Sequence, residues 1–328
     1  MLTGAPFHMI NVRANRPTPG LRPQHLTCVH AAAEICNAEV RGGEVGSSQV
    51  IFDPEEIQAG HYTFDTGTAG STALVIQTLL LPLAFATAPS IVGVAGGTHN
   101  ESAPSISYLD RVFIPACGRF GIDAKVTLER YGFYPKGGGR ATLRVQPLDM
   151  VQPLDRTTIP PGAIHTHASV LIHDLLNDVD QRELGIIRKA LAIKPTSEIT
   201  IRPDQNMAPL NPANVCAIEI KMGDLFEQCT ALGKRGRLAE FVAEEAVAQA
   251  NAFLAANVPV GPHLADQLLL PLAIFGGAFT TMPLTGHSLT NIEVINRFLS
   301  PEGDTGVFEI EEIGDTVRVR AKPAVLPR

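Results

Sequence analysis

A histidine in a polar turn is the residue whose type and surroundings best suit it to act as a nucleophile. His287 stands in the sequence Gly-His-Ser-Leu-Thr-Asn at 286–291, between a predicted strand and a predicted helix. A neutral imidazole attacks phosphorus near neutral pH, and the N–P bond that forms is labile enough to be passed on. The alternative is a structural histidine held by hydrogen bonds. His99, in Gly-Gly-Thr-His-Asn at 96–100, has similar surroundings, although a turn would also explain its glycines.

A second group of candidates is cationic and lies near the start of the sequence. No Asp or Glu occurs before Glu34, whereas three arginines do. A helix predicted to begin at Pro23 places part of this group at a helix N-terminus, where free amides and the helix dipole favour an anion. A solvated basic loop is the alternative. The candidates for an anion site are Arg13, Arg16, Arg22, Gln24 and His25.

Glycine-rich turns and histidine pairs support other kinds of site less well. The turns at 67–70 and 136–140 would suit phosphate binding by backbone amides, but neither has a P-loop or dinucleotide-binding pattern. His25 and His30 fall on different faces of the predicted helix. Three further histidines between 165 and 173 share one face of a predicted strand, which more often belongs to an ordinary strand than to a zinc site. The sequence therefore identifies no metal ligands.

An internal repeat indicates how the histidine turns are positioned. The segment Leu-Leu-Leu-Pro-Leu-Ala occurs at 79–84 and again at 268–273. Each copy follows a helical segment that contains a glutamine, Gln77 or Gln267, and each precedes a β-rich run and a histidine-bearing turn. A fixed arrangement that recurs in this way is typical of a duplicated structural unit. The sequence thus predicts two related helix–strand–turn–helix units.

Between the two copies the sequence changes in character. A linker rich in proline at 147–161 leads into alternating strand patterns and two predicted helices, and the repeat pattern returns near Val258. We therefore predict a small α+β domain at 157–250, inserted into a large domain formed by 1–156 and 251–328. The runs 307–313 and 316–321 predict a closing hairpin.

Composition excludes several classes of protein. The 26 basic and 33 acidic residues give a net charge of −7, which argues against a generally basic nucleic-acid coat but not against a local basic patch. The five cysteines contain no Cys-x-x-Cys pair, which is typical of reduced thiols and favours the cytoplasm. No signal peptide is evident, and the most apolar stretch, 73–86, is too short to span a bilayer. The sequence does not indicate an oligomeric state.

Taken in order along the chain, the motifs resemble those of the RNA 3′-terminal phosphate cyclase family. The similar segments are 13–17 (Arg-Ala-Asn-Arg-Pro), 19–25 (Pro-Gly-Leu-Arg-Pro-Gln-His), 67–71 (Gly-Thr-Ala-Gly-Ser), 96–98 (Gly-Gly-Thr), 132–139 (Gly-Phe-Tyr-Pro-Lys-Gly-Gly-Gly), 263–267 (His-Leu-Ala-Asp-Gln) and 287–292 (His-Ser-Leu-Thr-Asn-Ile). The resemblance covers nearly the whole chain. It implies an α+β fold in which the large domain consists of repeated β-α-β-β type units and carries an inserted small domain.

The same resemblance implies a reaction. ATP would convert a 3′-phosphate end of RNA into a 2′,3′-cyclic phosphate through AMP bound covalently to His287, usually with a divalent cation such as Mg²⁺ or Mn²⁺. The terminal phosphate or the triphosphate would be held by the cationic group that begins at Arg13. The nucleotide would be bound by Gln77, Tyr134, Pro135, His263, Asp266 and Gln267.

Three hypotheses stay open at this point. The family normally begins with a strand and a Glu-Gly-Gly-Gly-Gln turn that contributes a carboxylate to the nucleotide site, and this sequence begins just before the following strand. We expect either a misassigned start or a short form with weakened catalysis. The chain is then an active cyclase, or a cyclase-like protein that binds RNA or nucleotide without turnover. An enolpyruvyl transferase, whose large domains consist of similar repeats, is the third hypothesis.

Overall fold

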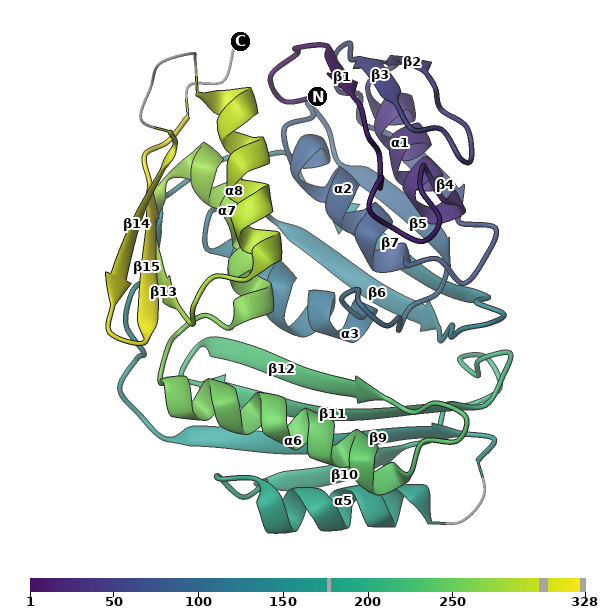
Figure 1. Cartoon of the computed structure of the whole chain (residues 1–328), viewed down its shortest axis with the longest axis vertical. Coiled ribbons are helices and arrows are strands. Elements are labelled where there is room, and N and C mark those ends of the chain that lie inside the picture. The colour runs from purple at the N-terminus through teal and green to yellow at the C-terminus, as the bar shows by residue number, and fades with distance from the viewer. Residues whose placement is uncertain (176–177, 301–305, 325–328) are drawn as a thin grey trace.

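Four β-sheets with helices packed against them make up the chain (Figure 1). The structure, a computed structural model, describes residues 1–175, 178–300 and 306–324. Its strands are β1 (Phe7–Met9), β2 (Glu39–Arg41), β3 (Val50–Asp53), β4 (His61–Asp65), β5 (Ser90–Gly96), β6 (Ala124–Arg130), β7 (Gly139–Val145), β8 (Leu154–Arg156), β9 (Ile164–His173), β10 (Ser197–Ile201), β11 (Ala213–Met222), β12 (Leu225–Leu232), β13 (Gly277–Thr281), β14 (Phe308–Ile313) and β15 (Thr316–Ala321). Its helices are α1 (Pro23–Ile35), α2 (Thr72–Ala84), α3 (Ile106–Tyr108), the π-helical turn η1 (Leu109–Phe113), α4 (Ile114–Gly118), α5 (Val179–Ala190), α6 (Ala239–Ala256), α7 (Pro262–Phe275) and α8 (Gly286–Leu299). This mixture confirms the predicted α+β class.

Two of the sheets repeat one topology. The strand orders are β4-β5-β7-β6 and β8-β13-β15-β14. In each sheet the first two strands are parallel, the third is antiparallel to the second, and the last two form an antiparallel pair. The six-residue repeats at 79–84 and 268–273 fall in α2 and α7, the helices that precede β5 and β13. The duplication predicted from the sequence is therefore confirmed, and the predicted closing hairpin is β14 with β15.

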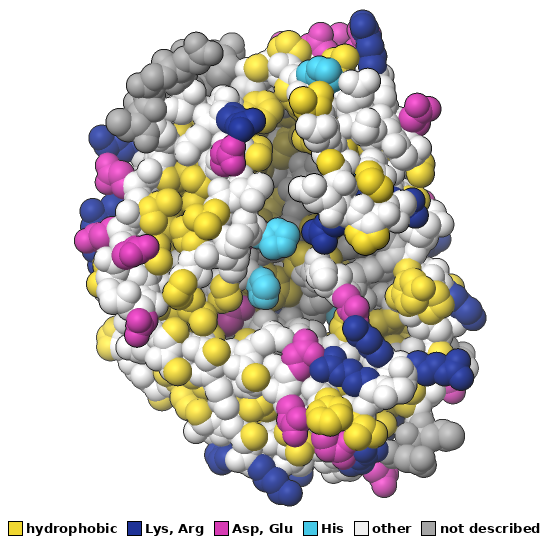
Figure 2. Space-filling view, in the orientation of Figure 1, with side chains coloured by type: hydrophobic (Ala, Val, Ile, Leu, Met, Phe, Trp, Pro, Cys, Tyr) yellow, Lys and Arg dark blue, Asp and Glu magenta, His cyan; other side chains and the backbone are white. Residues whose placement is uncertain are grey.

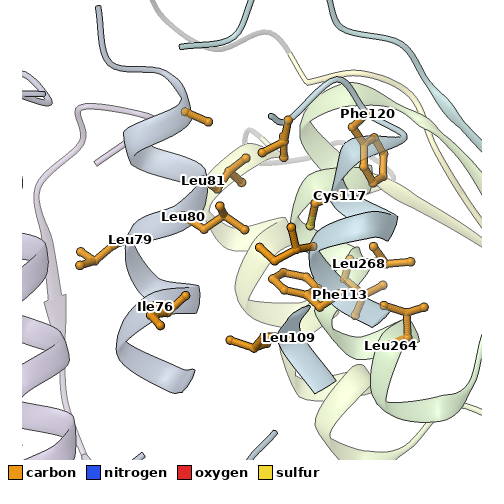
Figure 3. Close-up of a cluster of buried hydrophobic side chains, with 14 of the residues drawn as sticks. Ile76, Leu79, Leu80, Leu81, Leu109, Phe113, Cys117, Phe120, Leu264 and Leu268 are labelled. Carbon is orange, nitrogen blue, oxygen red and sulfur yellow. The ribbon is translucent and has the colours of Figure 1, made fainter. Parts of the chain in front are cut away.

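The two leucine-rich helices bury their apolar faces in one core (Figure 3). Leu79 and Leu80 of α2, Leu268 of α7 and Phe113 of η1 belong to this cluster, and each is at most 5% exposed. Full burial of a leucine side chain contributes roughly 1.5–3 kcal/mol to folding. Because both copies of the repeat share this core, the N-terminal ends of α2 and α7 are held in a fixed relationship.

A third sheet forms a separate unit between β8 and α7. Its strand order is β10-β9-β11-β12, and α5 and α6 pack against it around a second hydrophobic core. Helix α6 continues across the predicted boundary at 250, and buried residues as far as Val258 belong to this second core. In the first copy the corresponding position, between β4 and α2, is only a short loop. The division into two domains stays a prediction, and this unit is called the inserted unit below.

The remaining sheet, β1-β3-β2, lies near the start of the chain and accompanies α1, which packs against α2. Strand β1 ends at Met9, because Asn11 and Arg13 adopt positive φ angles of 56° and 53° that interrupt an extended chain. Among the helices of the described ranges, none is long and apolar enough to cross a membrane.

Candidate active site

His287 occupies the first turn of α8, and its side chain is exposed. Thr285 is the N-cap of this helix, and its Oγ1 accepts a hydrogen bond from the backbone N–H of Ser288 at 3.2 Å. The first turn contains no acidic residue. Free backbone amides and the helix dipole therefore favour an anion next to this imidazole.

Asp266 of α7 is linked to the same face of α8. The side-chain amide of Asn291 donates to the backbone oxygen of Asp266 at 3.1 Å and to its Oδ1 at 3.3 Å. Asn291 follows His287 by one helical turn, so the two side chains share a face of the helix. The structure thus brings Asp266 to the side of α8 that carries the imidazole, through an asparagine that we did not single out from the sequence.

Two further candidates lie on α7 beside Asp266. His263 in the first turn is exposed, and Gln267 follows it by one turn. The Oε1 atom of Gln267 is buried and has no hydrogen-bond partner within the described residues. A buried acceptor without a partner costs free energy, so this amide is available to a donor supplied by a ligand. Its role toward a nucleotide stays a prediction.

The anion candidates lie where α1 and α2 begin side by side. Gln24 Oε1 accepts a hydrogen bond from the backbone N–H of Ser71, the N-cap of α2, at 2.7 Å. His25 Nδ1 accepts one from the backbone N–H of Arg22 at 3.3 Å. Gln24 is therefore used to join the two helix ends, while the ring of His25 is held against the N-cap of its own helix.

The three arginines of this group are not equivalent. Arg13 Nη1 donates to the carbonyl oxygens of Thr18 and Gly20 at 2.6 and 2.9 Å, so it closes its own loop. Arg16 and Arg22 are exposed. Burial lowers the pKa of His25, and the positive charges of Arg13 and Arg22 lower it further. The neutral ring of His25 and the guanidinium groups of Arg13 and Arg22 form a patch with net positive charge. We call this group the cationic patch, and its charge favours the binding of an anion.

Three other predicted residues are not joined to α7 and α8. Gln77 is half-buried on α2, and Tyr134, which is 82% exposed, stands next to Pro135 in the loop between β6 and β7. This loop contacts the inserted unit instead, because Asn211 Nδ2 donates to the carbonyl oxygen of Tyr134 at 3.2 Å. Within the described residues, no hydrogen bond or ion pair connects any of the three to His287.

The glycine-rich turns are explained by packing and by internal hydrogen bonds. A Cβ atom at Gly137 would lie 2.7 Å from the carbonyl oxygen of Thr68, so a larger residue would not fit against the neighbouring turn. In that turn, the backbone N–H of Gly67 donates to Asp65 Oδ1 at 2.8 Å and that of Gly70 to Thr68 Oγ1 at 3.1 Å. Two of the four amides at 67–70 are thus already paired, and the amide of Gly137 donates to the carbonyl oxygen of Phe133 at 2.8 Å. This pairing and the close packing favour a structural role for both turns.

His99 differs from His287 in its burial and in its contacts. It is 4% exposed, and its ring packs against Tyr131 and Phe133 with centroid separations of 5.5 and 5.3 Å. Burial lowers its pKa to about 4, so it is neutral at physiological pH. Its Nδ1 is 2.9 Å from Thr98 Oγ1, and its Nε2 is 3.4 Å from Ser107 Oγ.

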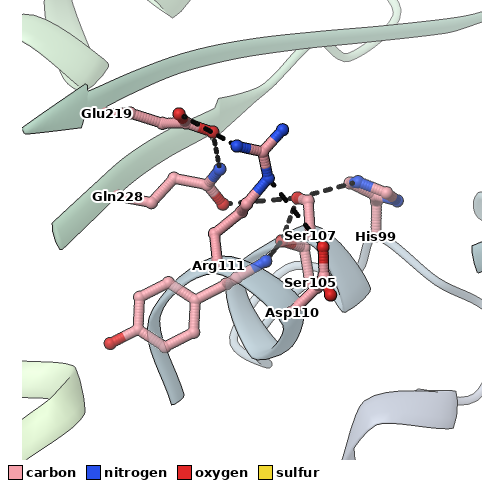
Figure 4. Close-up of polar contacts among 8 residues, drawn as sticks. His99, Ser105, Ser107, Asp110, Arg111, Glu219 and Gln228 are labelled. Carbon is pink, nitrogen blue, oxygen red and sulfur yellow. Dashed lines mark hydrogen bonds and ion pairs between the residues drawn. The ribbon is translucent and has the colours of Figure 1, made fainter. Parts of the chain in front are cut away.

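The hydrogen bonds around His99 continue into the inserted unit (Figure 4). Ser107 Oγ donates to Gln228 Oε1 at 3.3 Å, and Gln228 Nε2 donates to Glu219 Oε1 at 3.3 Å. Glu219 also lies 3.8 Å from a guanidinium nitrogen of Arg111. This network ties the turn of the first repeat to strands β11 and β12, so His99 has a structural role.

A hollow separates the lobe of α7 and α8 from the lobe of α1 and α2, with histidine side chains near its centre and Lys or Arg side chains at its edges (Figure 2). A cavity of about 400 Å³ occurs at the opposite ends of α2 and α7. The residues that line it all have apolar side chains: Ala84, Phe85, Ala86, Leu148, Val151, Ile274, Phe275 and Ala324. An apolar lining does not suit a charged nucleotide, so the hollow is the better candidate.

Comparison with known proteins shows the family to which the chain belongs. A model of the RNA 3′-terminal phosphate cyclase family matches residues 1–303. The RNA 3′-terminal phosphate cyclase of Ectopseudomonas mendocina is 43% identical over 304 residues, which are 92% of this chain and 87% of that protein. Those of Salmonella agona and Koribacter versatilis are 41% and 42% identical over 325 and 321 residues, each covering 97% of this chain and 90% and 88% of the relative. The chain therefore belongs to the RNA 3′-terminal phosphate cyclase family.

Proposed function

We propose that this chain is an enzyme that uses ATP to convert a 3′-terminal phosphate of RNA into a 2′,3′-cyclic phosphate. One ring nitrogen of His287 attacks the α-phosphorus of ATP, the bond from that phosphorus to the bridging oxygen breaks, and pyrophosphate leaves. An oxygen of the RNA 3′-phosphate then attacks the same phosphorus, the N–P bond breaks, and AMP passes to the RNA. The neighbouring 2′-hydroxyl loses its proton as it attacks the terminal phosphorus, and AMP leaves.

The observation that carries this proposal is the exposed imidazole in the first turn of α8. A nucleophile at a helix N-terminus meets an anionic phosphorus centre without repulsion from the protein, because the helix dipole favours the negative charge that develops in the transition state. Asp266 and Gln267 lie on α7, which packs against α8. The carboxylate of Asp266 is fixed by Asn291, and Gln267 offers an unused buried acceptor to a ligand donor.

The RNA end is assigned to the cationic patch of Arg13, Arg22 and His25, together with the exposed Arg16 of the same segment. Recognition of one terminal phosphate needs a local pocket and not a long basic groove, so it is compatible with the net charge of −7. Arg13 belongs to this group through its loop contacts and not through a free guanidinium. Gln24 contributes by joining the N-termini of α1 and α2.

A divalent cation belongs to the proposal only together with ATP. The described residues contain no cluster of three or more His, Cys, Asp or Glu side chains that would hold a metal ion by themselves. Mg²⁺ in nucleotide enzymes is often held largely by the substrate phosphates, with one or two protein carboxylates. On α7, Asp266 is our candidate for such a carboxylate. We assign no step of the reaction to the ion. A cytoplasmic location is proposed as well, in accord with the five unpaired cysteines.

The test is to incubate the protein with ATP labelled at the α-phosphate and to measure the label that stays on the denatured chain. The proposal expects a label that is labile in acid, as an N–P bond is, and that disappears in His287→Ala. His165→Ala is the matched control, because His165 is also an exposed histidine but lies on β9 of the inserted unit. Wild-type protein without label would indicate a protein that binds RNA or nucleotide without turnover.

A further inference from the structure

The N-terminus of helix α7 receives a carboxylate from another part of the chain. Helix α7 has no capping side chain of its own, because its N-cap is Gly261 and its first turn contains no acidic residue. Glu227 of β12, in the inserted unit, is 5% exposed and faces this helix end. A Cβ atom at Gly261 would lie 2.7 Å from Glu227 Cδ and would overlap Oε2, so the glycine leaves room for the carboxylate.

The two oxygens of Glu227 have different surroundings. Oε1 accepts a hydrogen bond from the backbone N–H of Gln228 at 3.0 Å. Oε2 makes no hydrogen bond of good geometry to the described residues, but the amide of Gly261 is close enough to lower the pKa of the carboxyl group. A negative charge at this place also interacts favourably with the positive end of the α7 dipole.

A chain of contacts leads from Glu227 to the proposed nucleophile. Gly261 begins α7, Asp266 lies on α7 and binds Asn291, and Asn291 lies one turn after His287 on α8. A shift of the N-terminal turn of α7 therefore moves the groups next to the imidazole. We infer that Glu227 is a positioning residue, which caps α7 from the inserted unit and so sets the geometry of Asp266 and His287. This inference rests on the proposed function.

The protonation state of Glu227 makes the inference testable. Burial raises the pKa of this carboxyl group to about 7, and the amides of Gln228 and Gly261 oppose the increase only in part. The other titratable groups that face it are Tyr108 of α3 and Cys229 of β12, and burial raises the pKa of both. Neither titrates between pH 5.5 and 8.5. Only the ionised carboxylate has both oxygens free to accept from the amides, so capping increases as the pH rises through 7.

The contribution of Glu227 to the stability of the fold changes with pH in the opposite direction to capping, because it decreases as the pH rises. The pKa of Glu227 is higher in the folded chain than in the unfolded chain, so its neutral form favours folding below about pH 4.5 and this contribution is lost as the pH rises through about 7. Glu227→Gln removes the buried charge. At pH 8 this variant is therefore expected to be at least as stable as the wild type, although it loses the cap. A residue that acted only through stability would change rate and stability in the same direction.

The experiment measures the rate of AMP attachment at saturating ATP from pH 5.5 to 8.5, together with the melting temperature. We expect Glu227→Gln to be slower than wild type by roughly tenfold at pH 8, a loss comparable to that of a helix cap, and to be within about twofold at pH 5.5, where wild-type Glu227 is protonated. Glu183→Gln is the matched control, because Glu183 is also a buried glutamate of the inserted unit whose pKa burial raises to about 7, and it binds Asn214 and not α7. Its rate relative to wild type should not depend on pH.

A second pair of variants tests the contact itself. Gly261 has φ −76°, which alanine accepts, so Gly261→Ala acts mainly by displacing the carboxylate. It should slow AMP attachment in the wild-type background and have no further effect in Glu227→Ala. A pH-independent rate ratio for Glu227→Gln, or additive losses in the double variant, would overturn the inference. Wild-type protein that forms no adduct at any pH would instead contradict the proposed function.

Discussion

Each repeat has a histidine in the segment that follows its second strand, and the two histidines have opposite surroundings. His99 follows β5, and His287 follows β13, in sheets of the same strand order. The first is 4% exposed and packs against two aromatic rings, whereas the second is exposed at the start of α8. His287 is the second residue of α8, whereas His99 lies seven residues before Ile106, the first residue of α3. The two connections therefore differ in backbone as well as in packing, and only the second presents its histidine to a substrate.

The inserted unit accounts for much of this difference. It covers the turn of the first repeat through the contact of Ser107 with Gln228. Toward the second repeat it contributes Phe226, which packs against the core that includes α7, and the carboxylate of Glu227, which faces the start of α7, while His287 stays exposed. The inserted unit thus covers the histidine turn of the first repeat and, in our inference, positions the histidine of the second repeat.

Replacement of the two histidines should have the largest and most contrasting effects. We expect His287→Ala to abolish AMP attachment with a free energy of unfolding close to that of wild type, because an exposed side chain leaves no cavity. Labelling with α-labelled ATP and chemical denaturation measure the two quantities. An adduct of normal yield in this variant would exclude His287 as the nucleophile.

His99→Ala should show the reverse pattern. Removal of a buried ring that packs against two aromatic side chains and contacts two hydroxyl groups is expected to destabilise the chain by about 3 kcal/mol. The surviving folded protein should still form the adduct at low temperature. A variant as stable as wild type would show that the aromatic cluster repacks without the ring, and loss of the adduct from well-folded protein would assign His99 a direct role.

The pH dependence of stability should also distinguish the first repeat. The pKa of His99 is about 4 in the folded chain and near 6.5 when unfolded, so the unfolded chain binds a proton first as the pH falls. Wild type should therefore lose about 3 kcal/mol relative to His99→Gln between pH 6.5 and 4. Denaturation of both proteins across this range measures the difference. Parallel curves would contradict the buried neutral state of this ring.

Substitutions in the cationic patch and at Arg16 are expected to have a smaller effect on the reaction. Arg16→Ala and Arg22→Ala should slow cyclisation of a 3′-phosphorylated RNA more than they slow AMP attachment, since the loss of a charged hydrogen bond commonly costs about 1.5–3 kcal/mol. Arg13→Ala is the contrasting variant, because Arg13 closes its own loop and should lower stability as well. Equal losses in both reactions for Arg16 and Arg22 would assign them to the nucleotide site.

The sequence predicted the elements of the second repeat well, because their signals are local. A repeated leucine-rich segment, a strand and a polar turn are each recognised within about twenty residues. The same reasoning gave His99 and His287 similar surroundings, because burial depends on contacts with Tyr131, Phe133 and Gln228 that are distant in the sequence. The sequence alone did not decide whether the glycines at 137–139 serve packing or phosphate binding. The close approach of Gly137 to the turn at 68 is a tertiary contact, which local sequence does not reveal.

Glu227 gave no sequence signal at all. It lies 34 residues before Gly261, since 261 − 227 is 34, and in a strand of the inserted unit it resembles any other alternating residue. Only the fold places it at the start of α7. Asn291 was part of a recognised motif, but its link to Asp266 depends on how α7 and α8 pack.

The most direct test of the account is to locate the AMP on the chain. Wild-type protein is incubated with ATP and a divalent cation, denatured without acid and digested, and the modified peptide is sequenced by mass spectrometry. We expect AMP on the peptide that contains residues 286–291, at His287, and unmodified peptide around His99. AMP on any other residue, or a chain that carries no AMP while it still cyclises RNA, would contradict it.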